Sequence, residues 1–60
     1  MDIQVENHGS IFLVKPLTNK AIKWLQENTN GQWLGNALAC EPRYIEDLVE
    51  GLYEEGFEII

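Results

Sequence analysis

The sequence predicts one two-layer α+β domain over residues 1–60, with a small mixed β-sheet, two helices on one face and the order β-β-α-β-α-β. Two observations predict this class. Residues 3–16 read as two short strands around a turn, and two later stretches have helical apolar spacing, each followed by a short apolar run. At this length only about 60% of the unfolded chain's surface can be buried. The lone Cys40 cannot form an internal disulfide, so packing or self-association must stabilise the fold.

A β-hairpin is predicted at the start of the chain. Side chains alternate in residues 3–7, with Ile3, Val5 and Asn7 on one side and Gln4 and Glu6 on the other. Residues 10–15 favour a strand, and the NHGS sequence at residues 7–10 is typical of a tight turn. We expect His8 and Gly9 to form a two-residue loop. The cross-strand pairs that this register predicts are Ile3 with Val14, Val5 with Phe12, Gln4 with Leu13, and Glu6 with Ile11.

One face of this hairpin is apolar and should join the core, whereas the other is only half apolar. Ile11 and Leu13 lie on that second face, where they are either covered by another element or exposed as a contact surface. A chain this short has no spare element to cover the outer face. A homodimer that assembles through Ile11 and Leu13 is therefore one hypothesis, and charged substitutions at both positions would abolish it.

The first helix is delimited by clear signals. Pro16 ends the second strand because it has no N–H for the ladder, and Thr18 is well placed as an N-cap. The helix should end near Asn28. The next segment, residues 32–40, favours a short buried strand, in which the Gly-Asn pair at 35–36 is either a bulge or a turn between two shorter strands.

The second helix is predicted to begin at Pro42, where a missing N–H is tolerated, and to be closed by Gly56. Residues 57–60 should form a last strand. At 100° per residue, the helix carries an apolar stripe on one side and acidic residues on the other. The acidic side consists of Glu46, Asp47, Glu50 and Glu54.

The net charge of −6 lies entirely in the last twenty residues. Residues 1–40 hold three acidic residues and three lysines, whereas residues 41–60 hold seven acidic residues and only Arg43. This distribution argues against direct binding to nucleic acid or to an anionic membrane, and favours a partner with a basic surface. The chain has no long apolar run and no signal-peptide pattern at its start, so we expect a cytoplasmic location.

The combination of NHGSIFLVKPLT, WL and WLGNALACEPRYIEDLVEGL, which covers most of the chain, resembles a group of short bacterial and mobile-element proteins. The resemblance implies a compact bacterial or phage-type protein. It implies no activity, ligand or site residue.

Residues that could support catalysis do not form a recognisable set. Cys40 precedes a helix N-terminus, which can lower a thiol pKa, but the neighbouring Glu41 opposes this and the single histidine, His8, belongs to a distant turn. The acidic side chains project from one helix and cannot converge on a metal or a substrate. We therefore predict no enzymatic activity, no catalytic residue, no metal site and no cofactor.

The function that we predict is protein binding through the second helix. Glu46, Asp47, Glu50 and Glu54 would face a basic surface of a protein partner, and Tyr44 would supply an apolar anchor. In its most specific form, the hypothesis states that the protein is a phage or mobile-element inhibitor whose carboxylates mimic the phosphates of a nucleic acid. The alternative is a structural or regulatory homodimer in which the acidic residues only maintain solubility.

Overall fold

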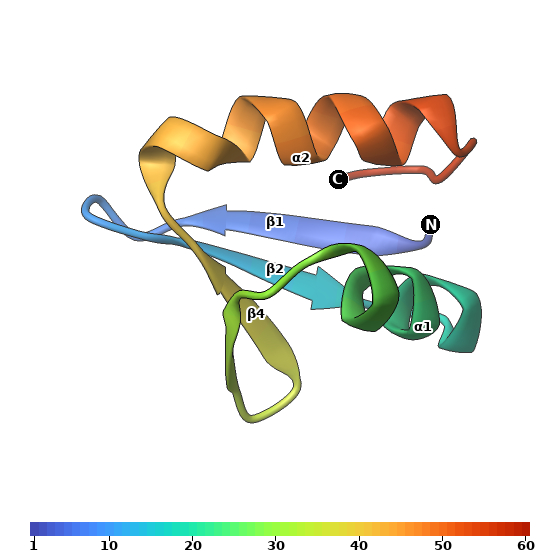
Figure 1. Ribbon diagram of the computed structural model, residues 1–60, viewed down its shortest axis with the longest axis horizontal. Helices are drawn as coiled ribbons and strands as arrows, with labels where there is room; N and C mark the ends of the chain where they lie inside the picture. Colours follow the sequence, from blue (N-terminus) through green and yellow to red (C-terminus); the bar gives the residue numbers. More distant parts are fainter.

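A computed structural model describes all 60 residues, and its ribbon is drawn in Figure 1. The α+β class and the predicted order β-β-α-β-α-β are confirmed. A short hairpin occupies the third strand position, and a single β-bridge occupies the last. The elements are β1 (Ile3–Asn7), β2 (Phe12–Pro16), α1 (Asn19–Asn28), β3 (Gln32–Leu34), β4 (Ala37–Cys40) and α2 (Pro42–Glu54).

The four strands form one sheet in the order β1-β2-β4-β3, with every neighbouring pair antiparallel. The C-terminal segment extends this sheet beyond β1, where Ile59 forms a parallel bridge with Ile3. Two backbone hydrogen bonds flank the bridge. The Val5 N–H donates to the Ile60 carbonyl at 2.9 Å, and the Ile60 N–H donates to the Ile3 carbonyl at 2.9 Å. The segment runs back beneath α2 to reach this position (Figure 1).

The predicted register of the β1–β2 hairpin is wrong by two residues. Val5 faces Val14 and not Phe12, so the connecting loop holds four residues and not two. A shift of two keeps every side chain on its predicted face of the sheet. The observed pairs are Ile3 with Pro16, Gln4 with Lys15, Val5 with Val14, Glu6 with Leu13, and Asn7 with Phe12.

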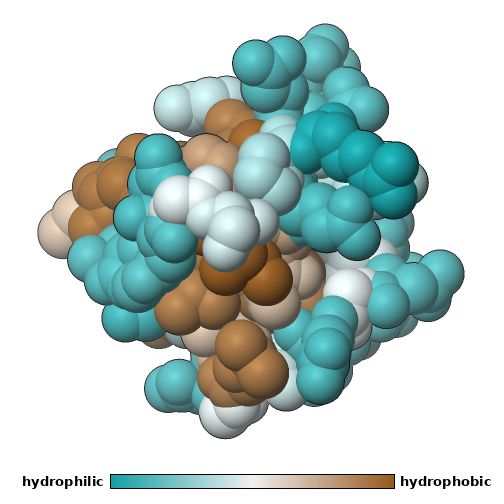
Figure 2. All heavy atoms as spheres, turned by 90° about the vertical axis from the view of Figure 1, so that its left-hand side faces the viewer, coloured by the Kyte–Doolittle hydropathy of each residue, from teal (hydrophilic) through white to brown (hydrophobic).

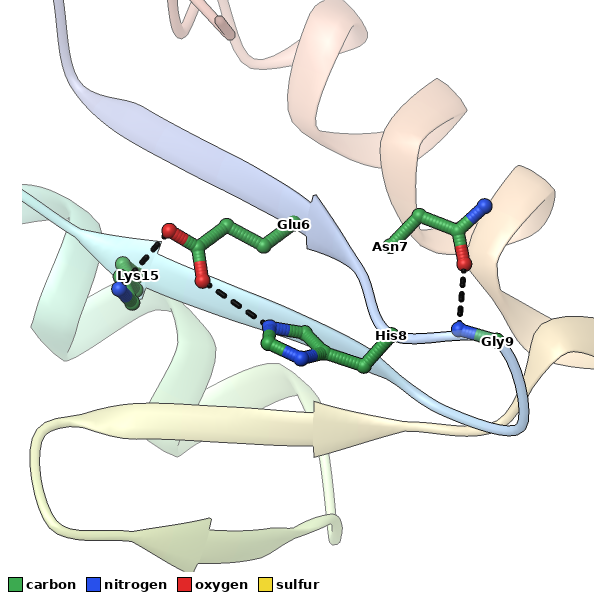
Figure 3. A network of polar contacts seen from close by, with 5 residues as sticks. All are labelled: Glu6, Asn7, His8, Gly9 and Lys15. Carbon is green, nitrogen blue, oxygen red and sulfur yellow. Dashed lines mark hydrogen bonds and ion pairs between the residues drawn. The ribbon is translucent and has the colours of Figure 1, made fainter.

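The conformation of the loop explains this register. A two-residue type I′ turn needs a positive φ at both central residues, but only Gly9 has one, at 82°, and His8 does not. The Asn7 Oδ1 instead accepts a hydrogen bond from the Gly9 N–H at 2.8 Å (Figure 3). The His8 N–H donates to the Ile11 carbonyl at 2.9 Å, which closes the longer loop.

The helix ends follow the predicted signals. Thr18 caps α1, with its Oγ1 accepting from the Ala21 N–H at 3.1 Å. Gly56, at φ 87°, ends α2 in a Schellman motif, in which the Phe57 N–H donates to the Leu52 carbonyl at 3.1 Å. This turn places the Phe57 ring, which is buried, against the core that Leu52 also joins.

Both helices cover the same face of the sheet and share one core. The buried cluster draws residues from three strands, from both helices and from the segment after α2. Trp24 of α1 and Trp33 of β3 are half-buried against it. Its members are Ile3, Val14, Ala21, Leu25, Leu38, Cys40, Ile45, Leu52 and Phe57.

Trp24 connects the two helices directly. Its indole Cη2 lies 3.5 Å from the point where a Cβ on Gly51 of α2 would stand, which is an ordinary van der Waals distance, so the ring packs against this part of the helix. The indole also meets the Phe57 ring edge-on, with centroids 6.1 Å apart and planes at 71°. This aromatic pair connects α1 with the segment that follows α2.

A polar cluster lies on the opposite face of the sheet, which no helix covers. The Lys15 Nζ donates to the Glu6 Oε2 at 3.0 Å, and the His8 Nε2 lies 3.1 Å from the Glu6 Oε1 (Figure 3). The Lys15 ammonium, followed by the His8 ring, lowers the pKa of the Glu6 carboxyl. Glu6 therefore stays ionised in the folded protein at a pH where it is partly protonated in the unfolded chain.

This shift makes the contribution of Glu6 to stability depend on pH. A carboxyl whose pKa is lower in the folded state stabilises the fold above its unfolded pKa of about 4.3. The contribution is lost as the pH falls through the folded pKa. We expect the Tm difference between the wild type and Glu6→Gln to be largest near neutral pH and to vanish in acid. Circular dichroism melts recorded from neutral to acidic pH test this expectation, and Glu27→Gln is the control. A difference that is constant with pH would contradict the assignment.

Candidate functional site

The predicted acidic residues form a ridge along the outer side of α2. Ile45 and Leu52 are buried and fix the inner side of this helix. At 100° per residue, the side chains opposite them must point away from the sheet. We call Glu46, Asp47, Glu50 and Glu54 the acidic ridge, and all four residues are exposed.

The acidic ridge has no ionic partner within the protein. The carboxylates that form ion pairs are those of Glu6, Glu41 and Glu58, none of which belongs to the ridge. The single arginine, Arg43, is held by Glu41 at 2.9 Å. Of the lysines, Lys15 pairs with Glu6, and the Lys20 Nζ lies over the Phe57 ring at 5.6 Å. The ridge charges therefore face solvent without compensation.

A shallow apolar hollow runs along one flank of the ridge. Ile45, Val49 and Tyr53 follow one another at four-residue spacing and line it, and its volume is about 520 Å³. The rim of this ridge hollow carries three members of the ridge, Glu46, Glu50 and Glu54. Tyr53 is 61% exposed, so a large apolar surface lies directly beside a row of negative charges.

The other flank of the ridge borders a deeper depression, which we call the interhelical groove. It lies between the end of α1, the β3–β4 hairpin and the start of α2, and has a volume of about 830 Å³. Trp24 and Leu48 contribute apolar surface to it, and the buried Leu38, together with Tyr44 and Asp47, also lines it. The five residues predicted to bind a partner are thus divided between the two flanks of one helix.

Figure 2 looks onto the end of the molecule that carries the β1–β2 loop and the start of α2. Hydrophilic atoms gather along the top of this view, where α2 lies in Figure 1, and apolar atoms are exposed below them. Hydrophilic and apolar surfaces therefore adjoin one another at this end of the molecule.

Arg43 and Tyr44 form a small cluster at the start of α2. The Arg43 guanidinium lies 4.8 Å from the centroid of the Tyr44 ring while its Nε donates to the Glu41 Oε2 at 2.9 Å. Tyr44 is 53% exposed. Both residues are therefore available at the surface, and Glu41 is the acidic residue that this arginine neutralises.

No family model, curated protein or solved structure matches this chain.

Ile11 and Leu13, the residues predicted for a dimer contact, lie in different surroundings. Leu13 faces Glu6 and Ala39 across the uncovered side of the sheet. Ile11 belongs to the β1–β2 loop and lines the interhelical groove. Both side chains are half-buried.

Cys40 is buried at the end of β4, beside the start of α2. Burial, and then the neighbouring Glu41 carboxylate, raises the pKa of its thiol. The Sγ donates to the Glu41 carbonyl at 3.6 Å. The thiolate, which is the nucleophilic form, is therefore scarce at neutral pH.

Two further structural findings concern other kinds of site. No group of three or more His, Cys, Asp or Glu side chains is arranged to hold a metal ion. Neither helix combines the length and the apolar character that crossing a membrane requires.

The interhelical groove could not be found from the sequence. It depends on the relative positions of α1, the β3–β4 hairpin and α2, which are set by tertiary packing. The one sequence signal was Trp24, which stands at the edge of the apolar stripe of α1 and would otherwise be assigned to the core.

Proposed function

We propose that the protein is a non-enzymatic interaction protein whose acidic ridge binds a basic surface of a protein partner. The supporting observation is that Glu46, Asp47, Glu50 and Glu54 are all exposed and none has an ion pair. Four uncompensated carboxylates on one helix produce a strong local negative potential. Such a potential accelerates the encounter with a basic partner.

The apolar surfaces on both flanks of the ridge provide the second component of this interaction. Charges at an exposed rim mainly raise the association rate, whereas buried aromatic and aliphatic contacts slow dissociation. Tyr53 in the ridge hollow and Tyr44 at the groove are the exposed aromatic residues available for this role. A partner surface that has apolar side chains among its lysines and arginines would match both the acidic ridge and these two tyrosines.

In the most specific version of the proposal, the partner is a bacterial nucleic-acid-binding protein, and the ridge occupies its phosphate-binding surface. The negative charge of residues 41–60 supports this version, because a phosphate-binding surface is itself rich in lysine and arginine. Duplex DNA should then compete with the protein for the partner.

Charge reversal on the ridge tests the proposal. A partner captured from bacterial lysate at low salt is identified, and its Kd is measured by calorimetry for the wild type, Glu50→Lys and Glu27→Lys. We expect Glu50→Lys to weaken binding by about tenfold or more, which corresponds to at least about 1.4 kcal/mol.

Glu27→Lys is the matched control. Glu27 is also an exposed helical glutamate without an ion pair, and its reversal changes the net charge by the same amount. Equal losses for the two variants would mean that only the total charge matters, and would refute a specific role for the ridge.

A further inference from the structure

The interhelical groove owes its shape to a close approach between the α1–β3 connection and β4. A Cβ on Gly31 would lie 2.7 Å from the Leu38 Cδ1 and 3.0 Å from the Ala39 carbonyl oxygen. Because glycine has no Cβ, the connection descends onto β4 at this point. Trp24 and Leu48, each half-buried, line the same groove with apolar surface.

The polar residues of the groove are acidic or neutral. Glu41 and Asp47 line it together with Asn28, Asn30 and Gln32, and no lysine, arginine or histidine is present among the lining residues. Glu41 is already paired with Arg43, whereas Asp47 has no partner. The groove therefore combines apolar walls with one uncompensated negative charge, which selects for a ligand that is both apolar and cationic.

The protein itself provides an example of how a guanidinium binds at this end of α2. Arg43 is in contact with the Tyr44 ring and with the Glu41 carboxylate at the same time. A planar guanidinium can stack on an aromatic ring while it donates in-plane hydrogen bonds to a carboxylate, which an ammonium cannot do as well. Asp47 lies one turn further along α2 and, like Tyr44, it lines the groove.

We propose that the interhelical groove binds an extended, arginine-containing segment of a protein partner. An apolar side chain of that segment lies against Trp24 and Leu48, and its arginine reaches Asp47 and the side of the Tyr44 ring that Arg43 does not cover. The amide side chains of Asn30 and Gln32 are suited to bond the peptide backbone of the segment, whereas the Asn28 Nδ2 already donates to the Trp24 carbonyl at 2.9 Å. A volume of about 830 Å³ holds more than one side chain. This inference rests on the proposed function, because it specifies the chemistry of the basic partner.

A defined peptide tests the inference without knowledge of the natural partner. Acetyl-Leu-Arg-Leu-Arg-amide is titrated into the ¹⁵N-labelled full-length protein and followed by NMR. We expect shifts at the Trp24 indole N–H and at the backbone amides of residues 28–32 and 44–48. Tyr44→Ala and Asp47→Asn are each expected to weaken the Kd by about fivefold or more.

Matched substitutions outside both the groove and the acidic ridge are the controls. Leu34→Ala and Glu27→Gln remove an exposed apolar side chain and an exposed carboxylate that line neither depression, and should leave the Kd within about twofold. A peptide with lysine in place of arginine should bind more weakly, and one with glutamate should not bind. All four substituted residues are exposed, so the variants should fold, which their circular dichroism melts verify.

The outcomes separate this inference from the proposed function. Shifts confined to the ridge hollow, equal effects of Asp47→Asn and Glu27→Gln, or no shifts at millimolar peptide would each overturn the groove assignment. The Glu50→Lys experiment would still decide the role of the ridge. Conversely, peptide binding in the groove together with unchanged partner affinity for Glu50→Lys would refute the ridge and leave the groove supported.

Discussion

Replacement of Leu52 by alanine is expected to leave a large fraction of the molecules unfolded at 25 °C. The Leu52 side chain is fully buried in the core that both helices share. Truncation of a buried leucine to alanine lowers the free energy of unfolding by about 2–5 kcal/mol. This loss is comparable to the whole stability of roughly 3–5 kcal/mol that one hydrophobic core supplies in a protein of this size. Urea denaturation followed by circular dichroism measures the loss.

Leu34→Ala provides the control for this substitution. Leu34 lies in β3 and is 51% exposed, so truncation there should change the free energy of unfolding by less than about 1 kcal/mol. Similar losses for Leu34→Ala and Leu52→Ala would show that the core is not organised around α2 as described.

Gly31→Ala is expected to destabilise the fold by about 1–3 kcal/mol, the usual cost of an added methyl group in a packed site. The new Cβ would overlap the Leu38 side chain, which is buried and cannot move freely, and would crowd the Ala39 carbonyl. The displacement of these neighbouring atoms should also narrow the interhelical groove. Thermal unfolding and urea denaturation detect the loss.

Gly51→Ala should have the opposite effect and is the natural comparison. A Cβ there meets Trp24 at 3.5 Å, an ordinary van der Waals distance, and lies inside a helix. Alanine is favoured over glycine in helices by about 0.8–1 kcal/mol, so this variant should be more stable than the wild type. A stabilising Gly31→Ala or a strongly destabilising Gly51→Ala would contradict the packing around these two positions.

The features of the fold that local chemistry determines could be predicted from the sequence. Thr18 caps α1, Pro42 begins α2, and Gly56 adopts the positive φ that ends it. The acidic side of α2 also followed from helical geometry alone, because residues opposite Ile45 and Leu52 must face outward. The hairpin register did not follow, because it depends on the conformation of His8 and on the Asn7 side chain.

The candidate site was only partly predictable for a similar reason. Helical spacing identifies the acidic residues, but it cannot show what lies next to each of them. Glu50 borders a hollow made by α2 alone, whereas Asp47 borders a groove that requires Trp24 and Leu38 from elsewhere in the chain. That division depends on contacts between residues far apart in the sequence, and no local pattern encodes it.

The C-terminal bridge has a consequence for the binding that we propose at the ridge. Covalent linkage to β4 holds one end of α2, and the segment at residues 57–60 holds the other end through hydrogen bonds to β1. The helix is thus anchored at both of its ends. A partner that docks on the acidic ridge meets a surface that is already ordered, and so loses little affinity to the conformational entropy of fixing it.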